Sequence, residues 1–120
     1  MQNKRVVVTG LGALTPIGNG VPAYWDGLIS GKSGSVPISY FDASKFKTQF
    51  ACELKGYDSN DHFDRKDVRK MDRFTQYAMV ATDEAVDDAG FRMESLDKTR
   101  VGVIWGAGIG GLETFQNEVL

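Results

Sequence analysis

The sequence predicts an α/β protein in which helices cover a parallel sheet. Residues 6–8 and 100–105 are rich in β-branched side chains, and each run leads into a glycine-rich turn, as buried sheet strands do. Amphipathic segments with helical spacing alternate with these runs. Such alternation is typical of parallel sheets with right-handed crossovers. Because two strands make a poor core sheet, we expect the chain to be an incomplete part of a larger domain.

The composition excludes several classes of function. The 120 residues carry a formal net charge of -2, so the chain has no global attraction to nucleic acid or to an anionic membrane. A single cysteine excludes an internal disulfide and a multi-cysteine metal site. No apolar run reaches membrane-spanning length, and no signal peptide is recognisable. We therefore expect a cytoplasmic protein without a metal, a nucleic-acid partner or a membrane partner.

A short helix and an irregular excursion follow the first predicted strand, and another helix is predicted near Leu120. Pro22 suits a first helical turn, and apolar residues then recur at helical spacing as far as Gly31. Residues 30–56 are irregular and contain a hairpin, in which Phe50, Cys52 and Leu54 alternate with polar neighbours like a half-exposed strand. The last helix, residues 112–120, has no stop signal.

The longest predicted helix covers residues 73–89, with Asp72 as the N-cap and Gly90 as the C-terminal stop. One apolar stripe defines it, made of Phe74, Tyr77, Ala78, Ala81, Ala85, Val86 and Ala89.

The glycine-rich turns have two interpretations. Residues 106–111 (GAGIGG) satisfy the G-x-G-x-x-G pattern of dinucleotide-binding proteins between a predicted strand and a helix. The acidic ribose ligand of that motif would lie past Leu120, and the motif normally follows the first strand. The earlier turn carries Thr15 where the third glycine belongs. We favour the alternative that glycines allow positive φ and close approach to neighbouring backbone.

Five segments together carry a family resemblance. They are residues 6–19 (VVVTGLGALTPIGN), 65–74 (RKDVRKMDRF), 88–90 (DAG), 100–103 (RVGV) and 106–112 (GAGIGGL). In this order and spacing the chain resembles the opening of elongating β-ketoacyl-[acyl-carrier-protein] synthases of the synthase II kind. The resemblance implies a thiolase-like αβαβα layered fold and a homodimer. Residues 1–120 would form the N-terminal part of its first half.

The resemblance implies a decarboxylative Claisen condensation in fatty-acid elongation, with no cofactor. Relatives use one cysteine and two histidines, which would lie beyond Leu120, so we assign no catalytic residue and expect this segment alone to be inactive. Cys52, on the apolar side of its predicted strand, is interpreted as a buried core thiol. His62 lies among acidic and amide residues and is interpreted as an exposed loop or helix-start residue.

Residues 65–73 contain five cations and predict a basic stripe. On one helix, Arg65, Arg69 and Arg73 would stack at i, i+4 spacing, and Lys66 and Lys70 would form a second row. The resemblance implies that Lys66, Arg69 and Lys70 meet the acidic surface of acyl carrier protein. The alternative is a solvated surface neutralised by its own acidic residues, Asp64, Asp67 and Asp72.

Ile109 matches the position where relatives place a branched side chain against the growing acyl chain, and Gly108 matches the glycine beside it. The alternative is an ordinary core isoleucine. Ala107 and Trp105 depart from the family pattern, which leaves the acyl-length preference open. Other functions also stay open: an aromatic-polyketide ketosynthase, a dinucleotide-binding oxidoreductase, and a silent fragment that only binds carrier protein.

Overall fold

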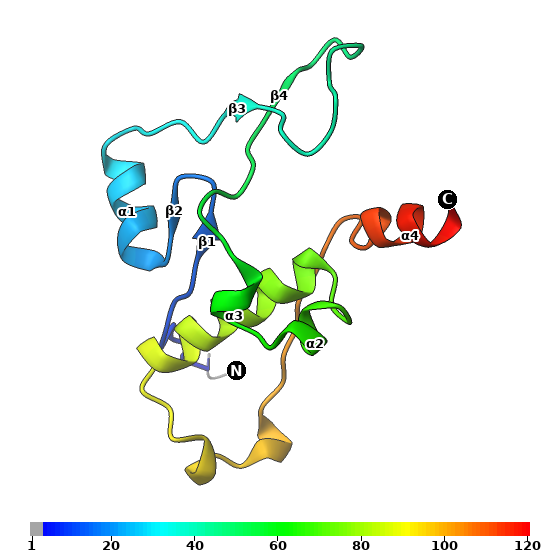
Figure 1. Cartoon of the computed structure of the whole chain (residues 1–120). Coiled ribbons are helices and arrows are strands. Elements are labelled where there is room, and N and C mark those ends of the chain that lie inside the picture. The colour runs from blue at the N-terminus through cyan, green and yellow to red at the C-terminus, as the bar shows by residue number, and fades with distance from the viewer. Residues whose placement is uncertain (1–3) are drawn as a thin grey trace. The chain divides into compact units, whose positions relative to one another are not determined.

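The computed structural model describes residues 4–120 and divides into two compact units (Figure 1). One unit is Ala13–Asp58. The other combines the N-terminal segment through Gly12 with Ser59–Leu120.

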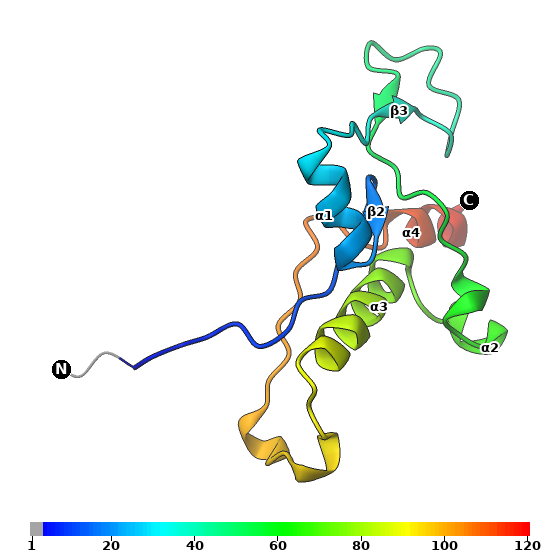
Figure 2. The ribbon, with the colours of Figure 1, turned by 90° about the vertical axis from the view of Figure 1, so that its left-hand side faces the viewer.

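The first unit contains a small antiparallel ladder and the first helix. Strand β1, Leu14–Thr15, pairs with β2, Gly18–Asn19, and the Thr15 hydroxyl closes the turn by donating to the Gly18 carbonyl at 2.8 Å. Helix α1, Val21–Ile29, carries its proline in the first turn and packs beside both strands (Figure 2). The helix expected before Gly31 is thus confirmed.

The expected hairpin is formed by β3, Val36–Pro37, and β4, Phe50–Ala51, which pair in antiparallel register. Its inside and outside are the reverse of the prediction. Phe50 is 63% exposed and Cys52 is also exposed, whereas Glu53 is buried. The Glu53 carboxylate accepts hydrogen bonds from the Ser39 hydroxyl at 2.6 Å and the Ser39 N–H at 2.9 Å, which turns residue 53 inward. The interpretation of Cys52 as a buried core thiol is therefore wrong for this structure.

The second unit is organised by helix α3, Arg73–Asp88, which ends before Gly90 at a φ of 64°, as the sequence predicted. The segment through Gly12 passes directly over this helix. A Cβ on Gly12 would lie 1.8 Å from the Ala81 carbonyl oxygen, and one on Gly10 would lie 2.1 Å from that of Ala85. Glycine is required there for close backbone approach, which confirms that part of the favoured interpretation of the first turn, whereas neither glycine has a positive φ.

The two predicted sheet strands are not strands among the described residues. Residues 6–8 and 101–107 do not pair with any described strand. Val6 is 89% exposed and Ile104 is 99% exposed. Strand geometry needs hydrogen bonds from neighbouring strands. Neither described ladder includes these segments, so the expected parallel sheet is absent from residues 4–120.

Shorter elements complete the second unit. These are η1 (Ser59–Asp61), α2 (Arg65–Val68), η2 (Met93–Ser95), η3 (Lys98–Arg100) and α4 (Leu112–Val119). The last of these confirms the predicted C-terminal helix. Ala43 is the one buried hydrophobic residue in the described chain, and many large apolar side chains are exposed. Within residues 4–120, no helix has the length and apolarity needed to cross a membrane.

Candidate functional site

The basic segment is shorter and more broken than predicted. Helix α2 ends at Val68, and the chain turns before α3 begins because Asp72 has extended backbone angles, φ −60° and ψ 154°. Arg65 and Arg69 therefore share one turn, but Arg73 belongs to another helix and does not stack with them. The prediction of one continuous basic stripe is wrong. Lys66, Arg69 and Lys70 are nevertheless all exposed.

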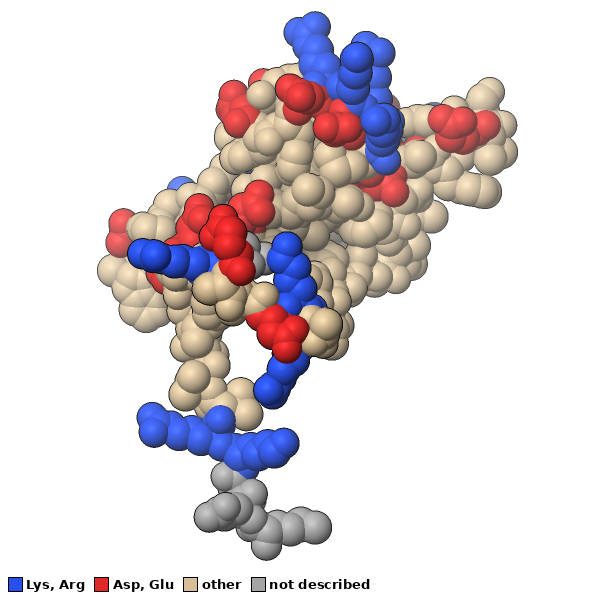
Figure 3. Space-filling model, turned by 90° about the horizontal axis from the view of Figure 1, so that it is seen from below, with Lys and Arg blue, Asp and Glu red and all other residues tan. Residues whose placement is uncertain are grey.

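Acidic neighbours neutralise this segment only in part. Lys70 lies 3.4 Å from Asp67 in an exposed i,i+3 pair, and Arg73 lies 3.6 Å from Glu113. Lys66 and Arg69 form no ion pair with any described residue, and neither does Arg65. Figure 3 shows Lys and Arg side chains projecting together over the α2 region, with acidic side chains beside them. Because exposed pairs stabilise by at most about 1 kcal/mol, they can exchange for an acidic partner.

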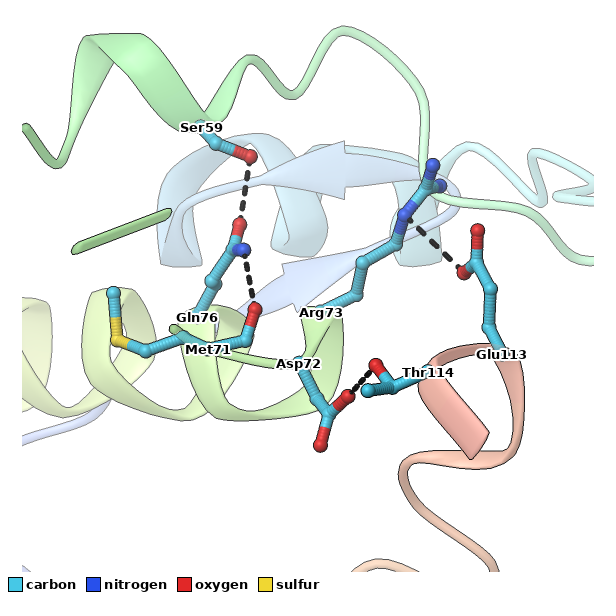
Figure 4. Close-up of polar contacts among 7 residues, drawn as sticks. All are labelled: Ser59, Met71, Asp72, Arg73, Gln76, Glu113 and Thr114. Carbon is cyan, nitrogen blue, oxygen red and sulfur yellow. Dashed lines mark hydrogen bonds and ion pairs between the residues drawn. The ribbon is translucent and has the colours of Figure 1, made fainter. Parts of the chain in front are cut away.

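A buried glutamine fixes both ends of the loop that carries the basic segment. Gln76 of α3 is only 3% exposed. Its amide oxygen accepts from the Ser59 hydroxyl at 2.6 Å, and its amide nitrogen donates to the Met71 carbonyl at 3.0 Å (Figure 4). Residues 59 and 71 lie on either side of residues 65–70, which are the basic segment. One side chain thus anchors the loop to the long helix.

The second glycine-rich turn is held by the beginning of α3. A Cβ on Gly110 would lie 2.6 Å from the Phe74 ring, and Gly111 has a φ of 79° as the N-cap of α4. Thr114 donates a hydrogen bond to the Asp72 carboxylate (Figure 4). Ile109 precedes these contacts and is 77% exposed, and Gly108 has open space around it. Ile109 is therefore not an ordinary core isoleucine in this structure.

The same geometry bears on the dinucleotide interpretation. That motif requires a strand that ends in a tight turn at its first glycine. Here residues 101–107 are not in a strand, and Gly106 has no described neighbour that a Cβ would meet within 4 Å. The glycines that the fold requires are Gly110 and Gly111, which contact α3 rather than an open anion site.

Cys52 and His62 do not form a described catalytic pair. Cys52 belongs to the first unit, and His62 lies in the second, exposed at the end of η1 beside Phe63. The prediction of an exposed histidine is confirmed. Among residues 4–120, no group of three His, Cys, Asp or Glu side chains is placed to hold a metal ion.

Comparison with known proteins decides the family. The family model described as "Beta-ketoacyl synthase, N-terminal domain" matches residues 3–119. The chain belongs to the β-ketoacyl synthase family.

Individual relatives agree with this assignment. The chain is 49% identical over 115 residues to "3-oxoacyl-[acyl-carrier-protein] synthase 2" of Staphylococcus aureus (strain COL), with 96% of this chain and 28% of the relative covered. The chain is 44% identical to the protein of the same name from Synechocystis sp. (strain ATCC 27184 / PCC 6803 / Kazusa), and the match covers 98% of this chain and 28% of that relative. The chain thus spans about 28% of the length of these curated relatives.

A solved structure is also similar to this β-ketoacyl synthase chain. "The ishigamide ketosynthase/chain length factor" superposes with a TM-score of 0.64 at 40% sequence identity, covering 75% of this chain and 22% of the other. At this identity the likeness supports common ancestry as well as a common fold.

Two functional features of this β-ketoacyl synthase chain could not be found from the sequence. Gln76 lies on the side of α3 away from the apolar stripe, so periodicity predicts an exposed residue. Asp72 occupies the predicted N-cap position, yet its side chain makes no capping bond and accepts from Thr114 instead. No local sequence signal indicates a contact between residues 42 positions apart.

Proposed function

We propose that the whole protein is a 3-oxoacyl-[acyl-carrier-protein] synthase of the synthase II kind. The observation that carries this proposal is the 49% identity to such a synthase over 96% of this chain. In the proposed reaction an acyl group is transferred from carrier protein to a cysteine, and malonyl-carrier protein loses carbon dioxide. The resulting carbanion attacks the acyl thioester, and the cysteine thiolate leaves.

This chain would contribute recognition rather than the reacting groups. We assign no nucleophile or base to it, and neither Cys52 nor His62 takes a catalytic role. The family membership supports a thiolase-like αβαβα arrangement in which residues 1–120 form the N-terminal part of the first half. Assembly as a homodimer and a cytoplasmic location belong to the same proposal.

Lys66, Arg69 and Lys70 would dock acyl carrier protein. All three are exposed, and neither Lys66 nor Arg69 forms an ion pair with a described residue. Complementary charge speeds encounter and fixes orientation, which a carrier delivering a tethered substrate requires. The Gln76 contacts would keep this loop in one orientation, so that the partner meets a preformed surface.

Gly108 and Ile109 would contact the acyl chain. Ile109 presents an apolar side chain to open space between two glycines, so it can touch a hydrocarbon tail and also move. An acyl chain would cover an apolar surface that no described residue covers. Replacing Ile109 by phenylalanine would then shorten the accepted chain.

The experiment that tests this function uses the full-length natural protein. It is incubated with acyl-carrier protein and malonyl-carrier protein, and the carrier-bound product is identified by mass spectrometry. A 3-oxoacyl product two carbons longer than the acyl donor supports the proposal. A folded protein that yields neither this product nor carbon dioxide would rule it out.

A second candidate, an aromatic-polyketide ketosynthase, is favoured by one observation. The solved structure at 40% identity is a ketosynthase/chain length factor. The same assay separates the two functions, since a polyketide enzyme would extend its product repeatedly with malonyl units without reduction between rounds. A single extension per turnover supports the first candidate.

A further inference from the structure

Ile109 has few local restraints, so its position depends on what holds the turn around it. Its side chain is 77% exposed, and glycines flank it on both sides. Before it, Gly106 and Gly108 would meet no described atom within 4 Å if they carried a Cβ. After it, Gly110, Glu113 and Thr114 contact residues at the start of α3. The C-terminal side of the turn is therefore its anchor within the described chain.

That anchor joins three consecutive residues at the start of α3 to three residues around the start of α4. The Phe74 ring lies close to Gly110. Arg73 pairs with Glu113 at 3.6 Å, and the Asp72 carboxylate accepts from Thr114 (Figure 4). The Arg73 and Glu113 side chains are 52% and 67% exposed, so their ion pair is a weak restraint. The hydrogen bond from Thr114 to a carboxylate is charge-assisted and directional. Like the ion pair, it is an exposed contact.

Asp72 gives up its usual role to make this bond. It stands at the N-cap of α3, where an aspartate normally accepts from its own helix, yet no such bond is formed. Its carboxylate instead lies beside Gly111, which is the N-cap of α4 and has no side chain of its own. A negative charge is favourable at a helix N-terminus, so one carboxylate of α3 stabilises the start of α4. An aspartate that stands at an N-cap without forming the capping bond departs from local preference, and such departures mark constrained positions.

We propose that Thr114, through its hydrogen bond to Asp72, is a positioning residue that sets the place of Ile109 and so the acyl length the enzyme accepts. The inference rests on the acyl role proposed for Ile109. Without the bond, the turn would be held less firmly, because the described contacts that remain include the Phe74 ring against Gly110 and an exposed ion pair, and the turn could move away from the acyl chain. Longer chains would then be accepted more readily.

The test compares Thr114→Val with Thr114→Ser in the full-length protein. Valine keeps the shape of threonine without the hydroxyl, and serine keeps the hydroxyl. The measured quantity is the ratio of kcat/KM for a long acyl-carrier protein to that for a short one. We expect Thr114→Val to raise this ratio about three- to tenfold, the effect of one lost hydrogen bond, and Thr114→Ser to match wild type. Asp72→Ala, which removes the acceptor, should raise the ratio in the same direction.

The outcomes separate this inference from the proposed function. A wild-type ratio in Thr114→Val, or equal shifts in the valine and serine variants, overturns the role of Thr114. Ile109→Phe is the independent check, and it should lower the ratio. If Ile109→Phe leaves the ratio unchanged, the acyl role of Ile109 itself fails. A shift with Ile109→Phe but none with Thr114→Val leaves the acyl role standing and rejects the anchor.

Discussion

The Ser59 hydroxyl donates a hydrogen bond to the Gln76 amide oxygen at 2.6 Å, and the Gln76 amide nitrogen donates to the Met71 carbonyl oxygen. This relationship ties the loop of the basic segment to α3 at both of its ends. It is among the few buried polar arrangements in the described chain, where Gln76 and Glu53 are the buried polar side chains.

Replacing Gln76 with leucine should lower the free energy of unfolding of the full-length protein by about 1–3 kcal/mol. The change leaves the Met71 carbonyl and the Ser59 hydroxyl without their partner while keeping similar bulk. Denaturant unfolding measures the effect. Asp83→Asn, at an exposed position of the same helix, is the control and should stay within about 0.5 kcal/mol of wild type. Equal stability of both variants would show that the Gln76 contacts are dispensable.

Alanine at Gly12 should also be destabilising, because its Cβ would lie 1.8 Å from the Ala81 carbonyl oxygen. A backbone atom cannot rotate away, so the segment must separate from α3, and we expect a loss of about 1–3 kcal/mol or more. Gly102→Ala is the comparison, since a Cβ there meets no described atom within 4 Å. Thermal unfolding of both variants checks the prediction. A Gly12→Ala protein as stable as Gly102→Ala would contradict the close packing.

The hairpin should weaken in acid through Glu53. Hydrogen bonds from the Ser39 hydroxyl, and next from the Ser39 N–H, lower the pKa of this carboxyl below its ordinary value of 4.5. The stabilisation is therefore present above pH 4.5 and is lost as the pH falls through the lowered pKa. The stability advantage of wild type over Glu53→Gln should shrink as the pH falls below that ordinary value, as followed by thermal unfolding.

The control for this pH effect is Glu94→Gln. Glu94 is exposed, and its carboxylate accepts no hydrogen bond from a described residue. The difference in thermal stability between wild type and Glu94→Gln should vary less with pH than the difference between wild type and Glu53→Gln. If both differences in stability change equally with pH, the Ser39 contacts do not account for the acid sensitivity.

Much of the fold follows from local sequence signals. The helix before Gly31, α3 and α4 were all predicted, because their apolar spacing and their terminal glycines act within a few residues of the chain. The close approach at Gly10 and Gly12 was also foreseen, since only glycine permits it.

What could not be predicted depends on contacts distant in the chain. Residues 6–8 and 101–105 have strand composition, but a strand also needs neighbours in space, and none pairs with them here. The hairpin turned Glu53 inward because Ser39, fourteen positions away, satisfies its carboxylate. The Asp72 and Gln76 contacts likewise join segments whose meeting has no local signal.

We propose that the basic segment of this chain receives acyl carrier protein, and the Kd of the full-length protein for that carrier at low and high salt measures this most directly. Lys66→Glu with Arg69→Glu should weaken binding about tenfold or more at low salt and remove most of its salt dependence. Arg92→Glu with Lys98→Glu changes the net charge equally at other exposed positions and should leave the Kd near wild type. An unchanged Kd in the first variant, or equal losses in both, would contradict the assignment of Lys66, Arg69 and Lys70 as the docking surface.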